Sequence, residues 1–324
     1  MLRAARLSAA LLLVTAAGIL PAACGGGGDR GFMSFGTAPP GGAFFVVGGA
    51  LVEVLNEAGA GRGWNITAEA TSGSQENIRR LASGELDFAV SNSAITYFAA
   101  RGGEGWDQAY PVRAVMTLAP NVAMFIAPRN SGVQRIADLR GKRVVIGPAG
   151  AGFEFFVTPL LAAHGLSYSD FTALNATQAA AVDMLADGSA AAAFIGGAVP
   201  TASITQAAAS QDIVFVPYDD EAMGRLSAEY PFFDRATVPA GTYRGQPGAL
   251  QMLDTGSMHL ITSADKDEQL VYDITKTLYE HREAVVQRHA AGRAINERNA
   301  PRNTGTEFHP GAIRFYREVG IWKE

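Results

Sequence analysis

The chain has 324 residues, of which 48% are hydrophobic and 18% charged, and its formal net charge is -5 at pH 7. This composition is typical of a folded chain long enough for two domains, and it excludes a disordered protein. The net negative charge gives no basic surface for nucleic acid, so no nucleic-acid partner is expected. The single cysteine excludes an internal disulfide and dithiol or multi-cysteine metal chemistry.

The first residues predict export. Two arginines precede an apolar stretch at 7–20 that is too short to span a bilayer comfortably. Small residues then lead to Cys24, and a glycine-rich tether follows at 25–31. The pattern resembles a bacterial lipoprotein signal, with residues 1–24 as signal peptide and Cys24 as the lipidated residue. Simple cleavage and release is the alternative. Both predict a periplasmic protein, lipid-anchored in the first case.

A glycine-rich turn at 36–42 opens the first of two similar halves. It follows a short apolar run at 32–35 and precedes an apolar helix predicted from about Ala43 to Leu55. A helix start carries unpaired N–H groups and partial positive charge, so a strand, a glycine-rich turn and a helix together can seat an anion. A plain connection without a ligand is the alternative, because the spacing is not that of a phosphate loop.

A polar cluster at 71–77 follows the strand predicted at 65–69. Ser74 is expected to cap a helix at 75–83. The cluster places hydroxyls, an amide and helix N–H groups at a strand end. Its residues therefore either cap the helix only, or cap it and also touch a ligand. Strands are predicted next at 112–118 and 122–127, the second of them crossing into the other half.

The turn at 147–152 repeats the arrangement of the first turn, between an apolar strand and a helix predicted at 153–164. The segments 81–90 and 185–194 also match, since both contain a helix end, a capping glycine and a buried strand. These two strands end in small residues, which are Ser91, Asn92, Ser93, Gly196 and Gly197. We predict that both halves present their strand ends to one shared cleft.

The rest of the chain completes the two predicted lobes. A strand at 170–174 leads to Asn175, a loop is expected at 235–243, and a strand at 258–262 returns to the first half. One amphipathic helix is predicted over 268–289. Lobe I is thus expected to comprise residues 32–121 and 259–324, and lobe II residues 122–258.

Known catalytic and metal-binding patterns are missing from the sequence. The histidines have no metal-ligand spacing, and there is no nucleophile elbow, phosphate loop or strict dinucleotide fingerprint. We therefore expect neither an enzyme nor a cofactor. Glu154 lies in the first turn of the predicted second-lobe helix. It is either favourably placed in the helix dipole or a partner for a cationic or hydroxyl group of a ligand.

Five segments, in order between Gly36 and Gly320, resemble the TRAP-associated extracytoplasmic immunogenic (TAXI) solute receptors. They read GTAPPGGAFFVVGGAL, ATSGSQENIRRLASGELDFAVSNSAI, ADLRGKRVVIGPAGAG, PAGTYRGQ and FHPGAIRFYREVG. The resemblance implies an α/β, bilobal periplasmic-binding-protein-like type II fold, with two α/β lobes joined by crossing hinge strands. It also implies a monomer that captures a small carboxylate or amino acid and passes it to a TRAP membrane permease.

The resemblance further implies which residues contact the ligand. On this chain they are Thr37, Gly41, Gly42, Phe44, Ser72, Ser74, Gln75, Asn77, Asn92, Gly150, Gly152, Phe153 and Glu154. Asn175, Gly196 and Gly197 join this set as residues expected at strand ends. Phe44, Ala151 and Phe153 stand where the family often carries hydroxyl groups, which predicts a less polar ligand. A receptor for an ABC importer of the sulfonate or pyrimidine-precursor kind, and a sensor or enzyme on the same scaffold, remain alternatives.

Overall fold

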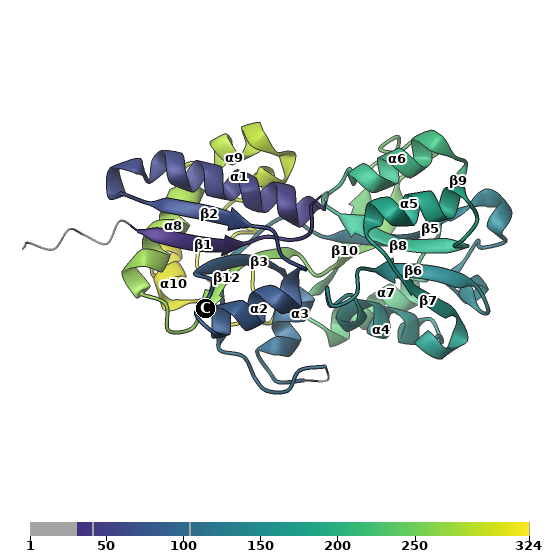
Figure 1. The fold of residues 1–324 in the computed structure, drawn as a ribbon, viewed down its shortest axis with the longest axis horizontal. Coiled ribbons are helices and arrows are strands. Elements are labelled where there is room, and N and C mark those ends of the chain that lie inside the picture. Colours follow the sequence, from purple (N-terminus) through teal and green to yellow (C-terminus); the bar gives the residue numbers. More distant parts are fainter. Residues whose placement is uncertain (1–30, 41, 104, 324) are drawn as a thin grey trace, which may run out of the picture.

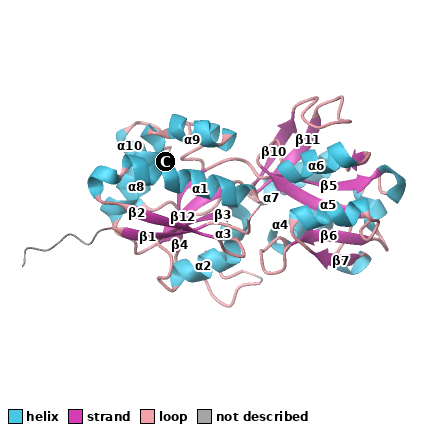
Figure 2. Cartoon of the chain, turned by 45° about the horizontal axis from the view of Figure 1, so that its top comes forward, coloured by secondary structure: helices cyan, strands magenta, loops and turns pink. Residues whose placement is uncertain are grey.

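The computed structural model describes residues 31–323 except Gly41 and Glu104, so the predicted signal peptide, Cys24 and nearly all of the tether lie outside the described residues. The described chain forms two α/β lobes arranged along the long axis of the molecule (Figure 1). Helices lie on both sides of the strands in each lobe (Figure 2). The short 3-10 helices are Ala60–Arg62, Arg129–Ser131, Ile136–Leu139, Tyr168–Asp170 and Ala290–Ala294.

Lobe I is built on a five-stranded sheet of order β2-β1-β3-β12-β4. Its strands are β1 (Phe32–Gly36), β2 (Asn65–Glu69), β3 (Phe88–Asn92), β4 (Val112–Thr117) and β12 (Met258–Ser263). β1 runs parallel to β2 and β3, whereas β12 is antiparallel to β3 and β4. The late strand β12 is therefore an interior strand of the first sheet.

The helices of lobe I cover both faces of its sheet. They are α1 (Ala43–Ala58), α2 (Ser74–Ala82), α3 (Ser93–Ala99), α8 (Glu268–Glu280), α9 (Arg282–Arg288) and α10 (Pro310–Glu318). Phe88 and Val90 of β3 pack with Leu51 of α1 and Ile274 of α8. Ala89, which points to the opposite face of the pleat, belongs to the cluster of α2 and α3.

Lobe II contains a seven-stranded sheet of order β10-β11-β5-β8-β6-β7, with β9 also pairing with β5. Its strands are β5 (Val122–Pro128), β6 (Arg143–Gly147), β7 (Thr172–Asn175), β8 (Ala192–Gly197), β9 (Ile213–Phe215), β10 (Phe233–Val238) and β11 (Leu250–Thr255). Its helices are α4 (Glu154–Ala163), α5 (Gln178–Ala186), α6 (Ala202–Ser210) and α7 (Asp220–Glu229).

The chain crosses between the lobes twice, and the two crossings are hydrogen-bonded to each other. One leads from β4 to β5 and the other from β11 to β12. Thr255 N donates to Asn121 O at 3.0 Å, and Met258 N donates to Ala119 O at 2.9 Å. The predicted two-lobe fold with crossing strands is therefore confirmed.

Two sequence predictions about single elements are wrong. Residues 235–243 are not all loop, because β10 extends to Val238 and pairs with β11. Pro239 and Gly241, which indicated a loop, lie directly after the end of this strand. The helix predicted over 268–289 is interrupted at His281, which ends α8 and precedes α9. The break lets Arg288 of α9 pair with Glu53 and Glu57 of α1.

Aromatic side chains join the two lobes beside the crossings. Phe98 and Trp106 of lobe I stack on Phe155 of α4, with ring centroids 5.6 Å and 5.7 Å apart. Tyr97 and Phe98 contact Phe232 of lobe II at 5.2 Å and 5.7 Å. We call these five residues the aromatic seam. Across the described residues, no helix combines the length and the apolar character that crossing a membrane requires.

Candidate functional site

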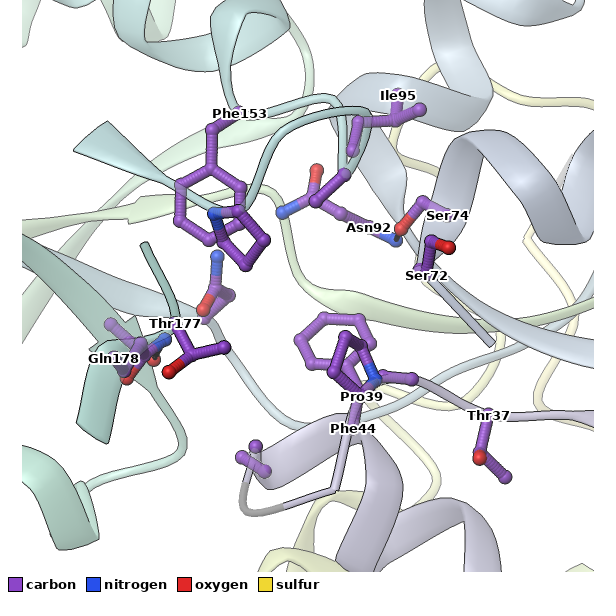
Figure 3. Close-up of a pocket in the computed structure, with 18 of the residues that line it drawn as sticks. Thr37, Pro39, Phe44, Ser72, Ser74, Asn92, Ile95, Phe153, Thr177 and Gln178 are labelled. Carbon is purple, nitrogen blue, oxygen red and sulfur yellow. Dashed lines mark hydrogen bonds between the residues drawn. The ribbon is translucent and has the colours of Figure 1, made fainter. Parts of the chain in front are cut away.

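The two glycine-rich turns line one cavity between the lobes, of about 120 Å³ (Figure 3). The first turn contributes residues before and at the start of α1, and the second contributes Pro148, Ala151 and Phe153. Eight residues that the sequence pointed to as ligand contacts line this cavity: Thr37, Gly42, Phe44, Ser72, Ser74, Asn92, Phe153 and Gly196.

The other predicted site residues lie around the cavity rather than on its wall. They are Gln75, Asn77, Gly150, Gly152, Glu154, Asn175 and Gly197, while Gly41 lies outside the described residues. Asn77 and Asn175 have matching structural roles. Asn77 Nδ2 donates to Thr37 O at 2.7 Å and to Val90 O at 2.8 Å. Asn175 Nδ2 donates to Gly147 O at 3.1 Å. Each amide thus holds one of the two turns in place.

Several lining residues were missed from the sequence. They include Pro39, Ile95, Asn121, Pro148, Phe156, Thr177, Gln178 and Ala179. A signal was present for Thr177 and Gln178, because they follow β7 just as Ser72 and Ser74 follow β2. Asn121 gave no such signal, since it lies on the first crossing between the lobes.

The first turns of helices from both lobes approach the cavity. Residues at the starts of α1, α2 and α5 line it, and Phe153 precedes α4. First-turn N–H groups have no partner inside their own helix, and they carry partial positive charge. α1 and α5 have no acidic residue in the first turn to offset that charge. The partial positive charge is therefore not offset by a carboxylate at these two helix starts, whereas Glu76 and Glu154 stand in the first turns of α2 and α4.

Most polar side chains on the wall already serve the fold. Thr37 Oγ1 donates to Glu69 O at 2.7 Å, and Gln178 Nε2 donates to Gly196 O at 2.7 Å. Asn92 Nδ2 donates to Gly256 O at 2.8 Å on the second crossing. Ser74 does not cap α2 as predicted, because Gly73 stands at the N-cap position. Ser74 Oγ instead accepts from Asn92 N at 3.0 Å, so its own hydrogen can point elsewhere.

Two carboxylates near the cavity accept hydrogen bonds, one from a side-chain amide and one from the backbone. Glu154 Oε1 accepts from Gln75 Nε2 at 3.4 Å, a contact between α4 of lobe II and α2 of lobe I. Glu76, in the first turn of α2, accepts from Ser72 N at 2.8 Å. That backbone hydrogen bond is the main reason why the pKa of Glu76 is lowered. Both carboxylates are thus engaged at helix starts.

Glycines permit the lobes to approach closely on two sides of the cavity. A Cβ at Gly152 would lie 2.8 Å from Cδ1 of Ile95 in lobe I, and a Cβ at Gly197 would lie 3.2 Å from Cβ of Ala43. Any real side chain at Gly152 would push against the opposite lobe. The two lobes therefore approach each other closely at both of these glycines.

A buried polar cluster lies at the second crossing. Asp254 is 2% exposed, accepts from Ser257 Oγ, and contacts Nη2 of Arg302 at 3.4 Å. Burial raises the pKa of Asp254 despite the nearby guanidinium. His259 is fully buried, its Nε2 lies 2.6 Å from Thr304 Oγ1, and burial lowers its pKa to about 3. None of these groups lines the cavity.

Comparison with known proteins identifies the fold. The model of the NMT1-like family matches residues 35–320. The periplasmic aliphatic sulphonate binding protein SsuA from Escherichia coli is 15% identical, with a TM-score of 0.52 over 89% of this chain and 83% of that chain. PhnD1 from Prochlorococcus marinus, in complex with methylphosphonate, is 8% identical, with a TM-score of 0.57 over 90% and 96%.

The protein CAE31940 from Bordetella bronchiseptica is 13% identical, with a TM-score of 0.52 over 90% of this chain and 89% of that chain. At such identities these structures show a shared fold and nothing about the ligand. The resemblance to TAXI receptors is wrong, because the family model that matches is that of the NMT1-like family. The prediction of a TRAP permease as partner, which rested on that resemblance, is therefore wrong as well. The five segments consist largely of glycine-rich turns and buried strands, which the fold itself requires.

Proposed function

This chain belongs to the NMT1-like family, and we propose that it is an extracytoplasmic solute-binding protein that captures a small organic acid between its lobes and delivers it to an ABC-type importer. The observation that carries this proposal is the cavity into which both glycine-rich turns and the starts of helices from both lobes converge. In open α/β sheets, ligands bind beyond the carboxyl ends of the strands, where these turns lie.

An acidic group suits this wall because backbone N–H groups at helix starts attract negative charge. The folds of a sulphonate-binding protein and of a phosphonate complex support an ABC-type importer as partner. Export to the periplasm and lipid anchoring through Cys24 belong to the same proposal, and they rest on the N-terminal sequence pattern.

We propose binding and release rather than catalysis. A solute receptor needs a cavity between two lobes, and the cavity of this chain supports the proposal. Within the described residues, no group of three or more His, Cys, Asp and Glu side chains could hold a metal ion. No observation on this chain favours the sensor or enzyme alternative over solute binding.

A thermal-shift screen of the purified protein against small acids tests the proposal. A ligand that binds only the folded state stabilises it by about 2.7 kcal/mol at a hundred times Kd, so a clear rise in Tm is expected. Mass spectrometry of molecules released on denaturation checks for a ligand retained through purification.

The variant Gly152→Trp should abolish the shift, because its side chain would meet Ile95 and Gln75 of lobe I. Gly150→Trp is the matched control. Gly150 also has a positive φ, but a Cβ there meets nothing within 4 Å. Equal ligand responses from the two variants would place the binding site elsewhere.

A further inference from the structure

The wall of the cavity restricts the charges that a ligand can carry. Among the lining residues that the structure describes, none is Asp, Glu, Lys, Arg or His. The carboxylate of Glu154, at the start of α4, contacts Gln75 instead of the cavity. Burying an ammonium group without a carboxylate partner is strongly unfavourable, and so is burying a second acid without a cation. Amino acids and diacids therefore do not suit this site.

The wall is dominated by apolar side chains from both lobes. Phe44 at the start of α1 and Phe153 at the start of α4 reach the same space from opposite lobes (Figure 3). Phe156, Ile95 and the prolines of the two turns complete the apolar surface. Such a surface binds a hydrocarbon body by excluding water, and phenyl rings that reach the cavity from opposite lobes favour a planar one.

The position of Phe153 is fixed by its surroundings. A Cβ at Gly147 would lie 2.6 Å from Cδ1 of Phe153, so the glycine at the end of β6 leaves the space that the ring occupies. The ring also packs on Phe156, with centroids 5.1 Å apart. Phe153 is therefore a rigid part of the wall, prepared before any ligand enters.

The size of the cavity indicates how large the apolar body can be. The cavity measures about 120 Å³, and an apolar protein cavity of about 150 Å³ accepts benzene. The cavity is smaller than that, so one ring fills it and the acidic group must extend toward the side of the cavity that is open to solvent. A small inorganic oxyanion, which has no apolar body, would leave most of the apolar wall without contacts.

We propose that the ligand is an aromatic monocarboxylate, with its ring between Phe44 and Phe153 and no ammonium or second acidic group. The acidic group is taken from the proposed function, on which this inference rests. The ring and the single charge come from the apolar, uncharged wall. Phe44 and Phe153 are then the residues that select the body of the ligand.

Isothermal titration with matched acids tests the ligand class. The probes are benzoate and phenylacetate, each compared with a relative that adds one charged group: phthalate for the first and 2-phenylglycine for the second. Succinate, glutamate and ethanesulfonate represent acids without a ring. We expect benzoate or phenylacetate to bind at least 100-fold more tightly than the relative that carries the extra charge.

Two variants test the role of the ring. Phe153→Leu keeps an apolar side chain but removes the ring, and it should weaken binding of the aromatic acid about tenfold. Phe32→Leu is the control, because Phe32 is 69% exposed on β1 and does not line the cavity. Circular dichroism and thermal melting verify that both variants fold. Equal affinities of the two variants would overturn the proposed role of Phe153.

The outcomes separate the ligand class from the proposed function. Tighter binding of succinate, glutamate or ethanesulfonate than of any aromatic monocarboxylate overturns the class but leaves solute binding in place. If no probe binds and no small molecule is released on denaturation, both fail. Aromatic acids that bind equally well to Gly152→Trp overturn the assignment of the ligand to this cavity.

Discussion

Nε2 of Gln75, on α2 of lobe I, donates a hydrogen bond of 3.4 Å to Oε1 of Glu154, on α4 of lobe II. The contact joins two helix starts that face each other across the boundary between the lobes. Cγ of the same Gln75 lies 3.1 Å from where a Cβ on Gly152 would stand. At Gln75, the two lobes therefore make a polar contact and also come too close to leave room for a side chain on Gly152.

Gly152→Ala should weaken ligand binding, because the added methyl group meets Ile95 only when the lobes are closed. Overpacking costs about 1–3 kcal/mol, which corresponds to a rise in Kd of about 5- to 140-fold. Gly150→Ala carries the same strain of a positive φ without a neighbour within 4 Å. Titration calorimetry should show that Gly152→Ala has the larger effect, and small-angle scattering should show a more open molecule. The reverse order would contradict the steric argument.

Arg302→Met should lower the free energy of unfolding by about 3 kcal/mol, since it leaves the buried Asp254 without its cationic partner. Urea denaturation measures the loss. Replacing both partners, as in Asp254→Asn with Arg302→Met, should recover part of it. Arg225→Met, which removes an exposed pair with Glu221, should cost less than about 1 kcal/mol. If Arg302→Met and Arg225→Met lowered the free energy of unfolding by similar amounts, the buried polar cluster at the second crossing would have no special role in stability.

Stability should fall as the pH is lowered below about 6.5, because burial depresses the pKa of His259 to about 3. The unfolded chain binds a proton at this histidine below its usual pKa of about 6.5, whereas the folded chain does not until about pH 3. The stability that His259 contributes by staying neutral is fully present above pH 6.5. Between pH 6.5 and about pH 3 it is lost by up to about 1.4 kcal/mol per pH unit. Urea denaturation between pH 5 and 7.5 measures it.

The variant His259→Asn should reduce this pH dependence. His281→Asn is the control, since His281 lies at the helix break outside the buried cluster. If His259→Asn does not change how the free energy of unfolding depends on pH, the acid sensitivity comes from other groups.

Phe155→Ala should destabilise the protein by about 3–5 kcal/mol, because Phe155 is buried in the aromatic seam between Phe98 and Trp106. The emission of Trp106 should also change when its stacking partner is removed. Guanidinium denaturation followed by tryptophan fluorescence measures both effects. The exposed Phe32 provides the control, and Phe32→Ala should change stability by about 0.5 kcal/mol or less.

The sequence predicted the two-lobe fold because glycine-rich turns, buried strands and helix starts are local signals. It did not predict the strand β10, since Pro239 and Gly241 directly after it indicate a loop. It assigned Asn77 and Asn175 to the ligand, which stays a prediction, whereas in the structure both amides donate to backbone carbonyls beside the cavity. Residue type alone does not reveal in which direction a buried amide points. Phe153 was predicted, but the space that Gly147 leaves for its ring required coordinates.

The place of β12 within the first sheet constrains how the protein can fold. β12 lies between β3 and β4, although lobe II is encoded before it. The amino-terminal half of the chain therefore cannot complete its own sheet until the last quarter of the polypeptide has been synthesised. Removal of the segment after lobe II would therefore take an interior strand out of the first sheet and separate β3 from β4.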